Sequence, residues 1–253
     1  MQYLSLSEAR TTSDLRLILC AGTPGVWGEA VKALFHVKGI PYTPVAMKPG
    51  FDNPELEDWT AQSSAPAIVT KQNKVLTHWE QFIWLAEELA PTPALVPEAV
   101  SDRATMFGLL RELAGVNGVG WLRRLQSLNA SGGPEAAEQL RRLADKYGYS
   151  DVAVNAAGER LEAILNVLTS QLRCQKEAGS DYYLTDKVSA LDLYSAIFVG
   201  VMIKPLPAAQ IPMPEGMRWA FTQSTAGIEN VDDILFEHCQ LIFRRYLPKS
   251  LSF

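Results

Sequence analysis

The sequence has few of the residues that build metal sites and disulfide frameworks. Its 253 residues include only three histidines and three cysteines. The cysteines are odd in number and too far apart for a C-x-x-C pair: Cys20, Cys174 and Cys239. The histidines do not form an H-E-x-x-H motif: His36, His78 and His238. We therefore expect neither a bound metal nor a disulfide framework.

Other absences bear on partners and location. The net charge of −5 argues against nucleic acid or an anionic membrane as the main partner, because both require a basic surface. The longest apolar run, residues 196–203, is far shorter than the ~20 residues of a membrane helix. Residues 1–14 lack the pattern of a signal peptide, so we expect a cytoplasmic protein. The dinucleotide-binding G-x-G-x-x-G, the P-loop and the G-x-S-x-G motif are absent too.

What is present begins with a strand, a turn and a helix. Residues 15–19 form an apolar run typical of a buried strand, and residues 22–25 are a turn rich in glycine and proline. From Trp27 onward apolar residues recur at helical spacing until Gly39, a C-terminal stop signal. A second strand follows over residues 40–47, and its prolines indicate an edge of the sheet.

The pair Ala65-Pro66 stands directly before a β-branched run over residues 67–70. Proline cannot donate to a strand ladder, so it fits the first residue of a strand, and an X–Pro bond is where a cis peptide is energetically accessible. Residues 75–76 complete a hairpin, and residues 77–89 form the next helix. This order of strands and helices predicts a thioredoxin-like unit and a place for a small thiol beside Pro66.

The character of the chain changes after Pro91. Residues 92–100 are a proline-rich linker, and residues 101–253 are almost entirely helical. We therefore divide the chain into an arm (1–13), a thioredoxin-like domain (14–91), the linker and an all-helical domain. Expected helices include 101–125, with a break possible at its three glycines, 134–147 with its proline in the first turn, 151–176 and 189–203.

Ser189 and Asp192 have the spacing of a capping box at the start of the helix over residues 189–203. The Asp192 carboxylate reaches back to the N–H of Ser189, while the serine hydroxyl accepts from the N–H of Asp192. Val188 and Leu193 occupy the positions of a hydrophobic staple. The motif is structural and says nothing about a substrate.

With these two motifs the chain resembles the glutathione transferase superfamily over residues 14–246. The resemblance implies a thioredoxin-like glutathione-binding domain, an all-helical second domain, glutathione as co-substrate and a homodimer. It implies that the main chain of Ala65, before the cis proline Pro66, pairs with the cysteinyl part of glutathione. Ser189 and Asp192 match the family's capping box in the core helix.

The family's catalytic tyrosine, serine or cysteine has no counterpart here. The corresponding positions fall near Ala21 and Gly25, which carry neither hydroxyl nor thiol. Thr23 is the nearest hydroxyl, interpreted either as a donor to the thiolate or as an ordinary turn threonine. The amides around Val26 and Trp27, at the helix start, favour an anion without any side chain. The neighbouring Cys20 is expected to be an inert strand cysteine.

A second departure lies at the helix that follows the hairpin. The family has an acidic residue followed by serine where His78 and Trp79 stand. Thr77 and Glu80 form a capping box around them, so the amides of this helix remain as a place for a glutathione carboxylate, with His78 or Trp79 packing over it. The other interpretation is that these residues only cap the helix.

The substrate-facing wall is expected on the long helix of the second domain. Met106, Phe107 and Arg111 recur there at helical spacing, and Trp121 and Arg124 follow. Such a stripe fits either a cleft for a hydrophobic electrophile or aromatic acid, or plain core.

Two functions remain open at this point. The favoured one is a glutathione-dependent transferase acting on a hydrophobic small molecule, with the thiolate stabilised by the first-helix amides and Thr23. The alternative is a non-catalytic binding or assembly protein that keeps the fold. A thiol–disulfide reductase is disfavoured, because Gly25 stands where it needs a cysteine.

Overall fold

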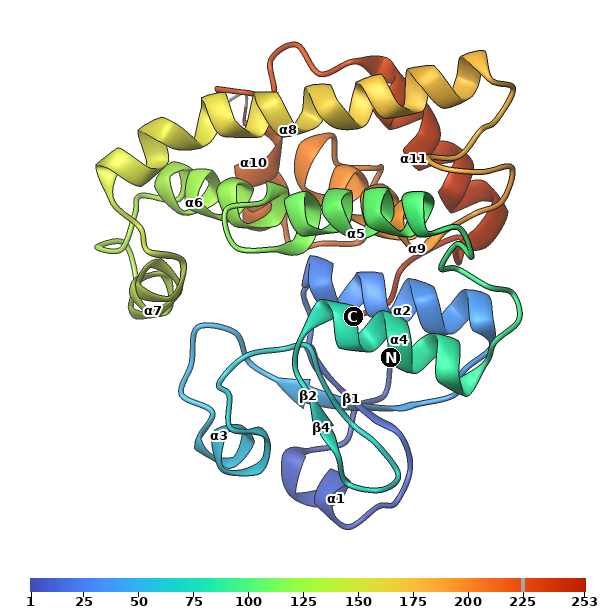
Figure 1. The fold of residues 1–253 in the computed structure, drawn as a ribbon. Helices are drawn as coiled ribbons and strands as arrows, with labels where there is room; N and C mark the ends of the chain where they lie inside the picture. The colour runs from blue at the N-terminus through green and yellow to red at the C-terminus, as the bar shows by residue number, and fades with distance from the viewer. Residues whose placement is uncertain (224–225) are drawn as a thin grey trace.

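Four strands form one mixed sheet in the order β2-β1-β3-β4 (Figure 1). The computed structural model describes residues 1–223 and 226–253. The strands are β1 Arg16–Cys20, β2 Thr43–Met47, β3 Ala67–Val69 and β4 Val75–Leu76. β1 is parallel to β2 and antiparallel to β3, and β3 is antiparallel to β4. Ile18 pairs with Val45 on one side and with Ala67 on the other, which confirms the predicted thioredoxin-like arrangement.

β2 lies at an edge, as its prolines predict, and the N-terminal residues extend that edge. Pro44 has no N–H, but its carbonyl accepts from the N–H of Leu4 at 3.0 Å, and Leu4 forms a bridge with Val45. The expected arm contains a short helix, α1 (Leu6–Arg10), which sequence reasoning missed. Its signal was the Ser5 and Glu8 capping box, in which the Glu8 carboxylate accepts from the N–H of Ser5.

Helices cover both faces of the sheet. α2 (Val26–Lys38) and α4 (Trp79–Leu89) pack on the face that carries Leu17 and Leu19. α1 and α3 (Pro54–Thr60) pack on the opposite face, which carries Ile18. The alternation along β1 is that of a strand buried on both sides. α2 ends at Gly39, whose φ of 63° is the left-handed C-cap conformation expected of glycine.

The remaining helices form the second, larger layer around α9. They are α5 Val100–Ala114, α6 Val119–Ala130, α7 Glu138–Tyr147, α8 Asp151–Glu177, α9 Ala190–Phe198, α10 Glu215–Thr222 and α11 Asp233–Tyr246. Every residue of α9 is buried, and α9 packs against α2, α5 and α11, so it joins the two layers. Within the described residues, no helix combines the length and apolarity needed to cross a bilayer.

In the helical domain, the break allowed at the glycines of residues 101–125 is confirmed, and one other expectation needs correction. The helix expected over residues 101–125 is broken, because α5 ends at Ala114 and α6 begins at Val119. A Cβ at Gly118 would lie 2.4 Å from the carbonyl oxygen of Glu112, so the tight turn between them requires glycine. α7 begins at Glu138 rather than at Pro134, which therefore lies in the preceding turn and not in the helix.

The N-terminus of α9 is held by the buried carboxylate of Asp192. Its Oδ2 accepts from the N–H of Ser189 at 2.8 Å, which is the predicted bond, and the Ser189 hydroxyl donates to the same oxygen at 2.6 Å. Its Oδ1 accepts from the N–H of Tyr183 at 3.0 Å and lies 2.8 Å from Nε2 of His238. Asp192 therefore links three segments of the helical domain.

Candidate functional site

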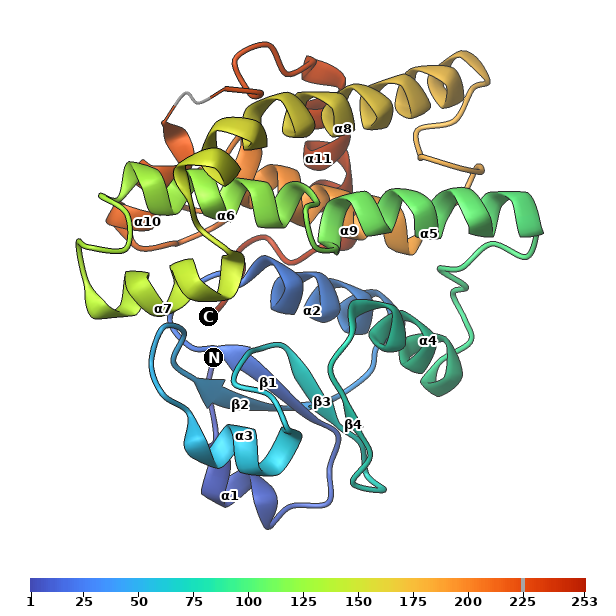
Figure 2. The same cartoon turned by 60° about the vertical axis from the view of Figure 1, so that its left-hand side comes forward.

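A cavity of about 870 Å³ lies between the sheet layer and the helical layer. Its first wall is the turn after β1, the start of α2 and the loop before β3, and its second wall comes from α6, α7 and α10. Figure 2 shows α7 reaching from the helical layer toward α3, so the opening is flanked by elements of both layers. The size is that of a pocket for a small organic ligand.

The start of α2 presents free backbone amides beside this cavity. Gly25 is the N-cap and has no side chain to satisfy them, and the first backbone bond of the helix runs from the N–H of Glu29 to the carbonyl of Gly25. The N–H groups of Val26, Trp27 and Gly28 precede that bond and therefore lack partners within the helix. Gly25, Trp27 and Gly28 line the cavity, which places the positive end of the helix dipole there.

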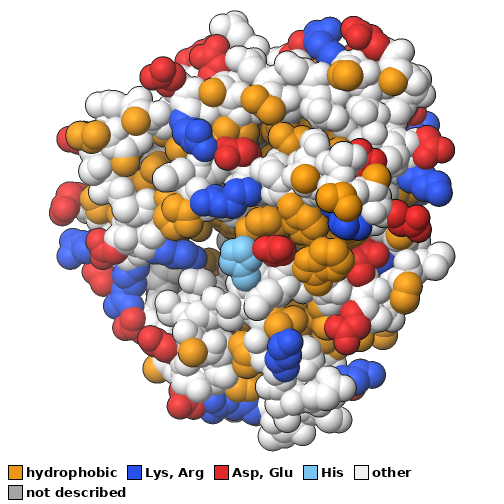
Figure 3. All heavy atoms as spheres, in the orientation of Figure 1, with side chains coloured by type: hydrophobic (Ala, Val, Ile, Leu, Met, Phe, Trp, Pro, Cys, Tyr) orange, Lys and Arg blue, Asp and Glu red, His pale blue; other side chains and the backbone are white. Residues whose placement is uncertain are grey.

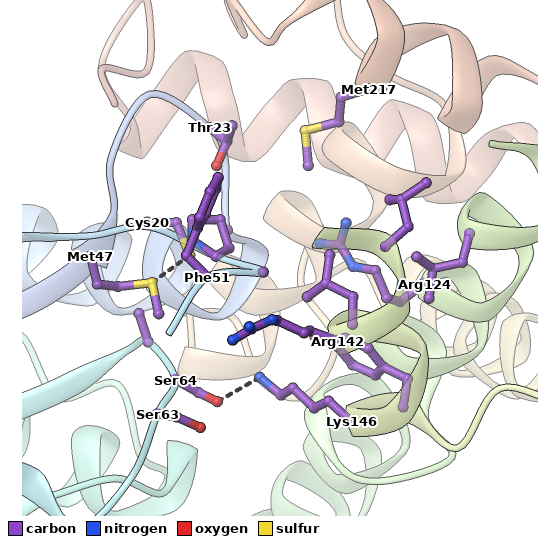
Figure 4. Close-up of a pocket in the computed structure, with 18 of the residues that line it drawn as sticks. Cys20, Thr23, Met47, Phe51, Ser63, Ser64, Arg124, Arg142, Lys146 and Met217 are labelled. Atoms are coloured by element: carbon purple, nitrogen blue, oxygen red, sulfur yellow. Dashed lines mark hydrogen bonds between the residues drawn. The ribbon is translucent and has the colours of Figure 1, made fainter. Parts of the chain in front are cut away.

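Thr23 and Cys20 lie at the same end of the cavity (Figure 4). Thr23 is half-buried, and its hydroxyl has no hydrogen-bond partner among the described residues. Burial raises the pKa of the Cys20 thiol, against the opposing charges of Arg124 and Lys146. Its Sγ lies 3.9 Å from Sδ of Met47. The structure thus agrees with an inert Cys20, because a raised thiol pKa reduces the thiolate fraction.

The loop before β3 forms the neighbouring part of this wall. The Ala65–Pro66 peptide bond is cis, as predicted, and both residues line the cavity. The amide Nε2 of Gln62 donates to the carbonyl of Ser64 at 2.7 Å and to that of Pro66 at 3.3 Å, which holds the loop in place.

Three cations reach the cavity from the helical layer (Figure 4). Nζ of Lys146 donates to the hydroxyl of Ser64 at 2.8 Å, and Arg142 forms an ion pair with Asp52, so both tie α7 to loops of the sheet layer. Arg124, on α6, has no ion pair within the described part of the chain. Three carboxylates line the cavity as well (Asp52, Glu57 and Asp145), so Arg124 is the cation best placed to meet an anionic ligand.

A search for proteins of similar structure finds matches that cover nearly the whole chain. A glutathione transferase homologue from Sulfitobacter with bound glutathione is 17% identical, with 92% of this chain and 94% of that one covered and a TM-score of 0.61. A Pseudomonas putida glutathione transferase with bound glutathione disulfide is 14% identical, with 95% of this chain and 92% of that one covered and a TM-score of 0.65. Ure2p in complex with glutathione is 14% identical, with 94% of this chain and 98% of that one covered and a TM-score of 0.62. The fold is that of the glutathione transferases.

Searches with the sequence do not find this fold. No protein-family model matches the sequence, and a search of curated proteins finds no significant match. The expected glutathione transferase fold, with its thioredoxin-like and all-helical parts, is therefore confirmed at identities too low for sequence comparison to detect.

His78 and Trp79 lie elsewhere in the glutathione transferase fold than expected. Neither lines the cavity. His78 is the exposed N-cap of α4, while Trp79 is buried and packs its ring against Phe107 at 6.3 Å. The expected capping box of Thr77 and Glu80 is wrong, because Oε1 of Gln81 accepts from the N–H groups of Thr77 and His78, both at 3.1 Å. Those two amides are therefore occupied and not free for a glutathione carboxylate.

Of the five residues expected on the substrate wall, Arg124 lines the cavity and the other four do not. Met106 is fully buried in the core, and Phe107 stacks on Trp84 at 5.5 Å. Nη1 of Arg111 donates to the carbonyl of Val116, and Nε1 of Trp121 donates to the carbonyl of Tyr147. The break between α5 and α6 separates Met106, Phe107 and Arg111 from the α6 face that lines the cavity. Trp121 is on α6 itself and packs its ring against Tyr147 at 4.7 Å.

Apart from Arg124, the helical wall of the cavity was missed from sequence. On α6 it consists of residues at helical spacing on one face: Arg124, Ser127 and Leu128, followed by Ser131 just past the helix. The helical spacing of these residues can be seen in the sequence. However, the face that they form mixes polar and apolar side chains and therefore resembles a solvent-exposed face. The cavity-lining residues of α7 and α10 have no comparable sequence pattern, because only tertiary packing brings those helices near Pro66.

Proposed function

We propose that this chain binds glutathione in the cavity and joins its thiolate sulfur to a hydrophobic electrophile. The observation that carries the proposal is that Trp27 and Gly28, whose amides are free at the start of α2, line the same cavity as the cis Ala65–Pro66 pair. The cysteinyl main chain of the tripeptide pairs with Ala65, and its sulfur lies at the amides of Val26 to Gly28. The bound glutathione in the structures of similar fold supports this arrangement.

For this reaction the site must stabilise the thiol of bound glutathione as a thiolate. A free thiol has a pKa of ~8.5, and an unsatisfied helix N-terminus lowers that value by favouring the anion. Thr23 adds one hydroxyl donor at the same end of the cavity. The thiolate sulfur then forms a bond to the electrophilic carbon, the leaving group departs with its electron pair, and the thiol proton has already passed to solvent.

A non-catalytic binding protein is the second candidate. It is favoured by the positions of Ala21 and Gly25, which leave the half-buried Thr23 as the sole hydroxyl in the turn after β1. The two candidates share the glutathione site and differ in whether the thiol is activated there.

Replacing Thr23 by valine tests both candidates. We expect kcat/KM for a chloronitroaromatic acceptor to fall about 10-fold and its pH profile to move upward, because one hydrogen bond to a charged group contributes about 1.5–3 kcal/mol. Calorimetric titration should show glutathione binding to the wild type and to the variant.

Thr23→Ser is the matched control, because it keeps the hydroxyl and should retain most of the activity. If glutathione does not bind the wild type at millimolar concentration, the glutathione proposal is wrong. Binding without turnover in the wild type favours the non-catalytic candidate. Full turnover in Thr23→Val assigns thiol activation to the amides alone.

The proposal includes a homodimer formed through the face of α4 and α5. Trp84 on α4 is 46% exposed and stacks on Phe107 of α5 at 5.5 Å. Figure 3 shows apolar atoms gathered on this face of the molecule. An exposed aromatic pair of this kind is typical of an interaction surface.

Trp84→Glu is expected to convert the dimer to a monomer, because it places a charge in an apolar interface. Light scattering coupled to size exclusion measures the change from the mass of two chains to that of one. The control is Trp219→Glu, since Trp219 is 53% exposed, close to the 46% of Trp84, but lies on α10. If the wild type elutes as a monomer, the dimer proposal is wrong, and the proposal of a glutathione site is unaffected.

A further inference from the structure

Arg124 is an unpaired cation in the wall of the cavity. It lies on α6, and its guanidinium is directed into the cavity in Figure 4. Among the described residues, its buried Nε has no hydrogen-bond partner, and no carboxylate lies within ion-pair distance of the guanidinium. A buried donor without a partner is costly, so such a group points to an acceptor that the chain itself does not supply.

The two other cations of the cavity differ from Arg124. Arg142 is paired with Asp52 and with Glu138, and the ammonium of Lys146 is exposed and bonded to Ser64. Both therefore have their interactions at the rim. Arg124 instead lies over the ring of Phe221, with 5.6 Å between its Cζ and the ring centroid. The aromatic face fixes the guanidinium plane without neutralising its charge.

The surroundings of Arg124 define the rest of the ligand. The neighbouring wall is apolar and is built by α6, α7 and α10 with side chains from each: Leu128, Leu140, Leu143, Met217, Ala220 and Phe221. Guanidinium groups bind carboxylates through two parallel hydrogen bonds. An apolar wall around one guanidinium suits a ligand with an aromatic or aliphatic body and an anionic head.

We propose that the acceptor of this chain is an anionic apolar electrophile, such as an aromatic carboxylate, whose anionic group binds Arg124. This inference rests on the proposed transferase function, since it names the class of the second substrate. Arg124 comes from the layer opposite the α2 amides, so the acceptor lies between the guanidinium and the glutathione sulfur. In a substitution on a chloronitroaromatic ring, the thiolate sulfur bonds to the ring carbon and chloride leaves with the C–Cl electron pair.

The test compares two acceptors that differ in one charge, 4-chloro-3-nitrobenzoate and 4-chloro-3-nitrobenzamide. Each kcat/KM is divided by the rate constant for the uncatalysed reaction with glutathione, which removes the difference in intrinsic reactivity. We expect the wild type to prefer the benzoate by at least 10-fold. Arg124→Met should abolish this preference by raising KM for the benzoate, while kcat/KM for the benzamide changes by less than about twofold. Arg124→Lys should retain part of the preference for the benzoate.

Arg141→Met is the matched control. Arg141 lies on α7 outside the cavity, so this variant removes the same charge without changing the wall. It should keep the preference for the benzoate. Circular dichroism verifies that each variant is folded before the kinetics are compared.

The outcomes separate this inference from the function on which it rests. If glutathione binds and the benzamide is conjugated, but the benzoate preference is absent or survives in Arg124→Met, the inference is wrong and the transferase function stands. If glutathione does not bind, the transferase function fails, and calorimetry with benzoate alone decides the role of Arg124. Binding of the benzoate that weakens at least 10-fold in Arg124→Met then supports the anion site, and unchanged or absent binding overturns it.

Discussion

Replacing Asp192 by alanine is expected to lower the free energy of unfolding by about 3–5 kcal/mol, the usual cost of removing one partner from a buried hydrogen-bonded charge. Asp192 is fully buried, and its two oxygens accept from the N–H groups of Ser189 and Tyr183 and pair with Nε2 of His238. The substitution leaves all three partners buried without an acceptor. The free energy of unfolding is measured by denaturant titration.

Asp232→Ala is the matched control, because Asp232 is also a helix N-cap but lies at the exposed start of α11. Its carboxylate accepts from the N–H of Ile234 at 3.0 Å and pairs with Arg173. Loss of such a cap costs about 1 kcal/mol. Similar losses in the two variants would contradict a special role for the buried network around Asp192.

The features that sequence reasoning recovered are those with a local chemical cause. The strand before Gly22, the cis bond at Pro66 and the reach of Asp192 back to Ser189 each depend on a few neighbouring residues. Their order along the chain then fixes the sheet, because connections between strands follow few topological rules. The break at Gly118 was readable for the same reason, since a glycine in a helix has a local cost.

The helical wall of the cavity depends on distant packing and, apart from Arg124, was not recovered. Arg124 meets Phe221 from a helix almost a hundred positions later, and Lys146 meets the loop at Ser64 only because α7 projects toward the sheet layer. Met106 and Phe107 have the same helical spacing as residues of the wall. Met106 nevertheless lies in the core, and Phe107 lies beside Trp84. Periodicity identifies an apolar face but not what that face contacts.

The capping box at α4 failed for a subtler reason. Two overlapping boxes are possible there, one from Thr77 to Glu80 and one from His78 to Gln81, and both have the required spacing. The second is realised, with the Gln81 amide oxygen accepting from both preceding N–H groups.

Replacing Val26 by proline is expected to reduce kcat/KM for glutathione conjugation by about 100-fold, the effect of removing one backbone donor from an anion-stabilising site. Val26 is the first residue of α2, where proline fits the helix and lacks only its N–H. Gly25 before it has φ −75° and ψ 104°, an extended conformation that a following proline tolerates. The pKa of the bound thiol, followed by thiolate absorbance, should rise in parallel.

Val26→Ala separates the amide from the side chain. Val26 is fully buried, so alanine lowers stability through lost packing while keeping the N–H, and its kcat/KM should stay near the wild-type value. If both variants lose activity equally, the amide has no part in activating the thiol. If Val26→Pro acts only together with Thr23→Val, the hydroxyl and the amide bind the same sulfur, since strong coupling between two substitutions indicates a shared partner. Independent effects would instead assign them to different atoms of the tripeptide.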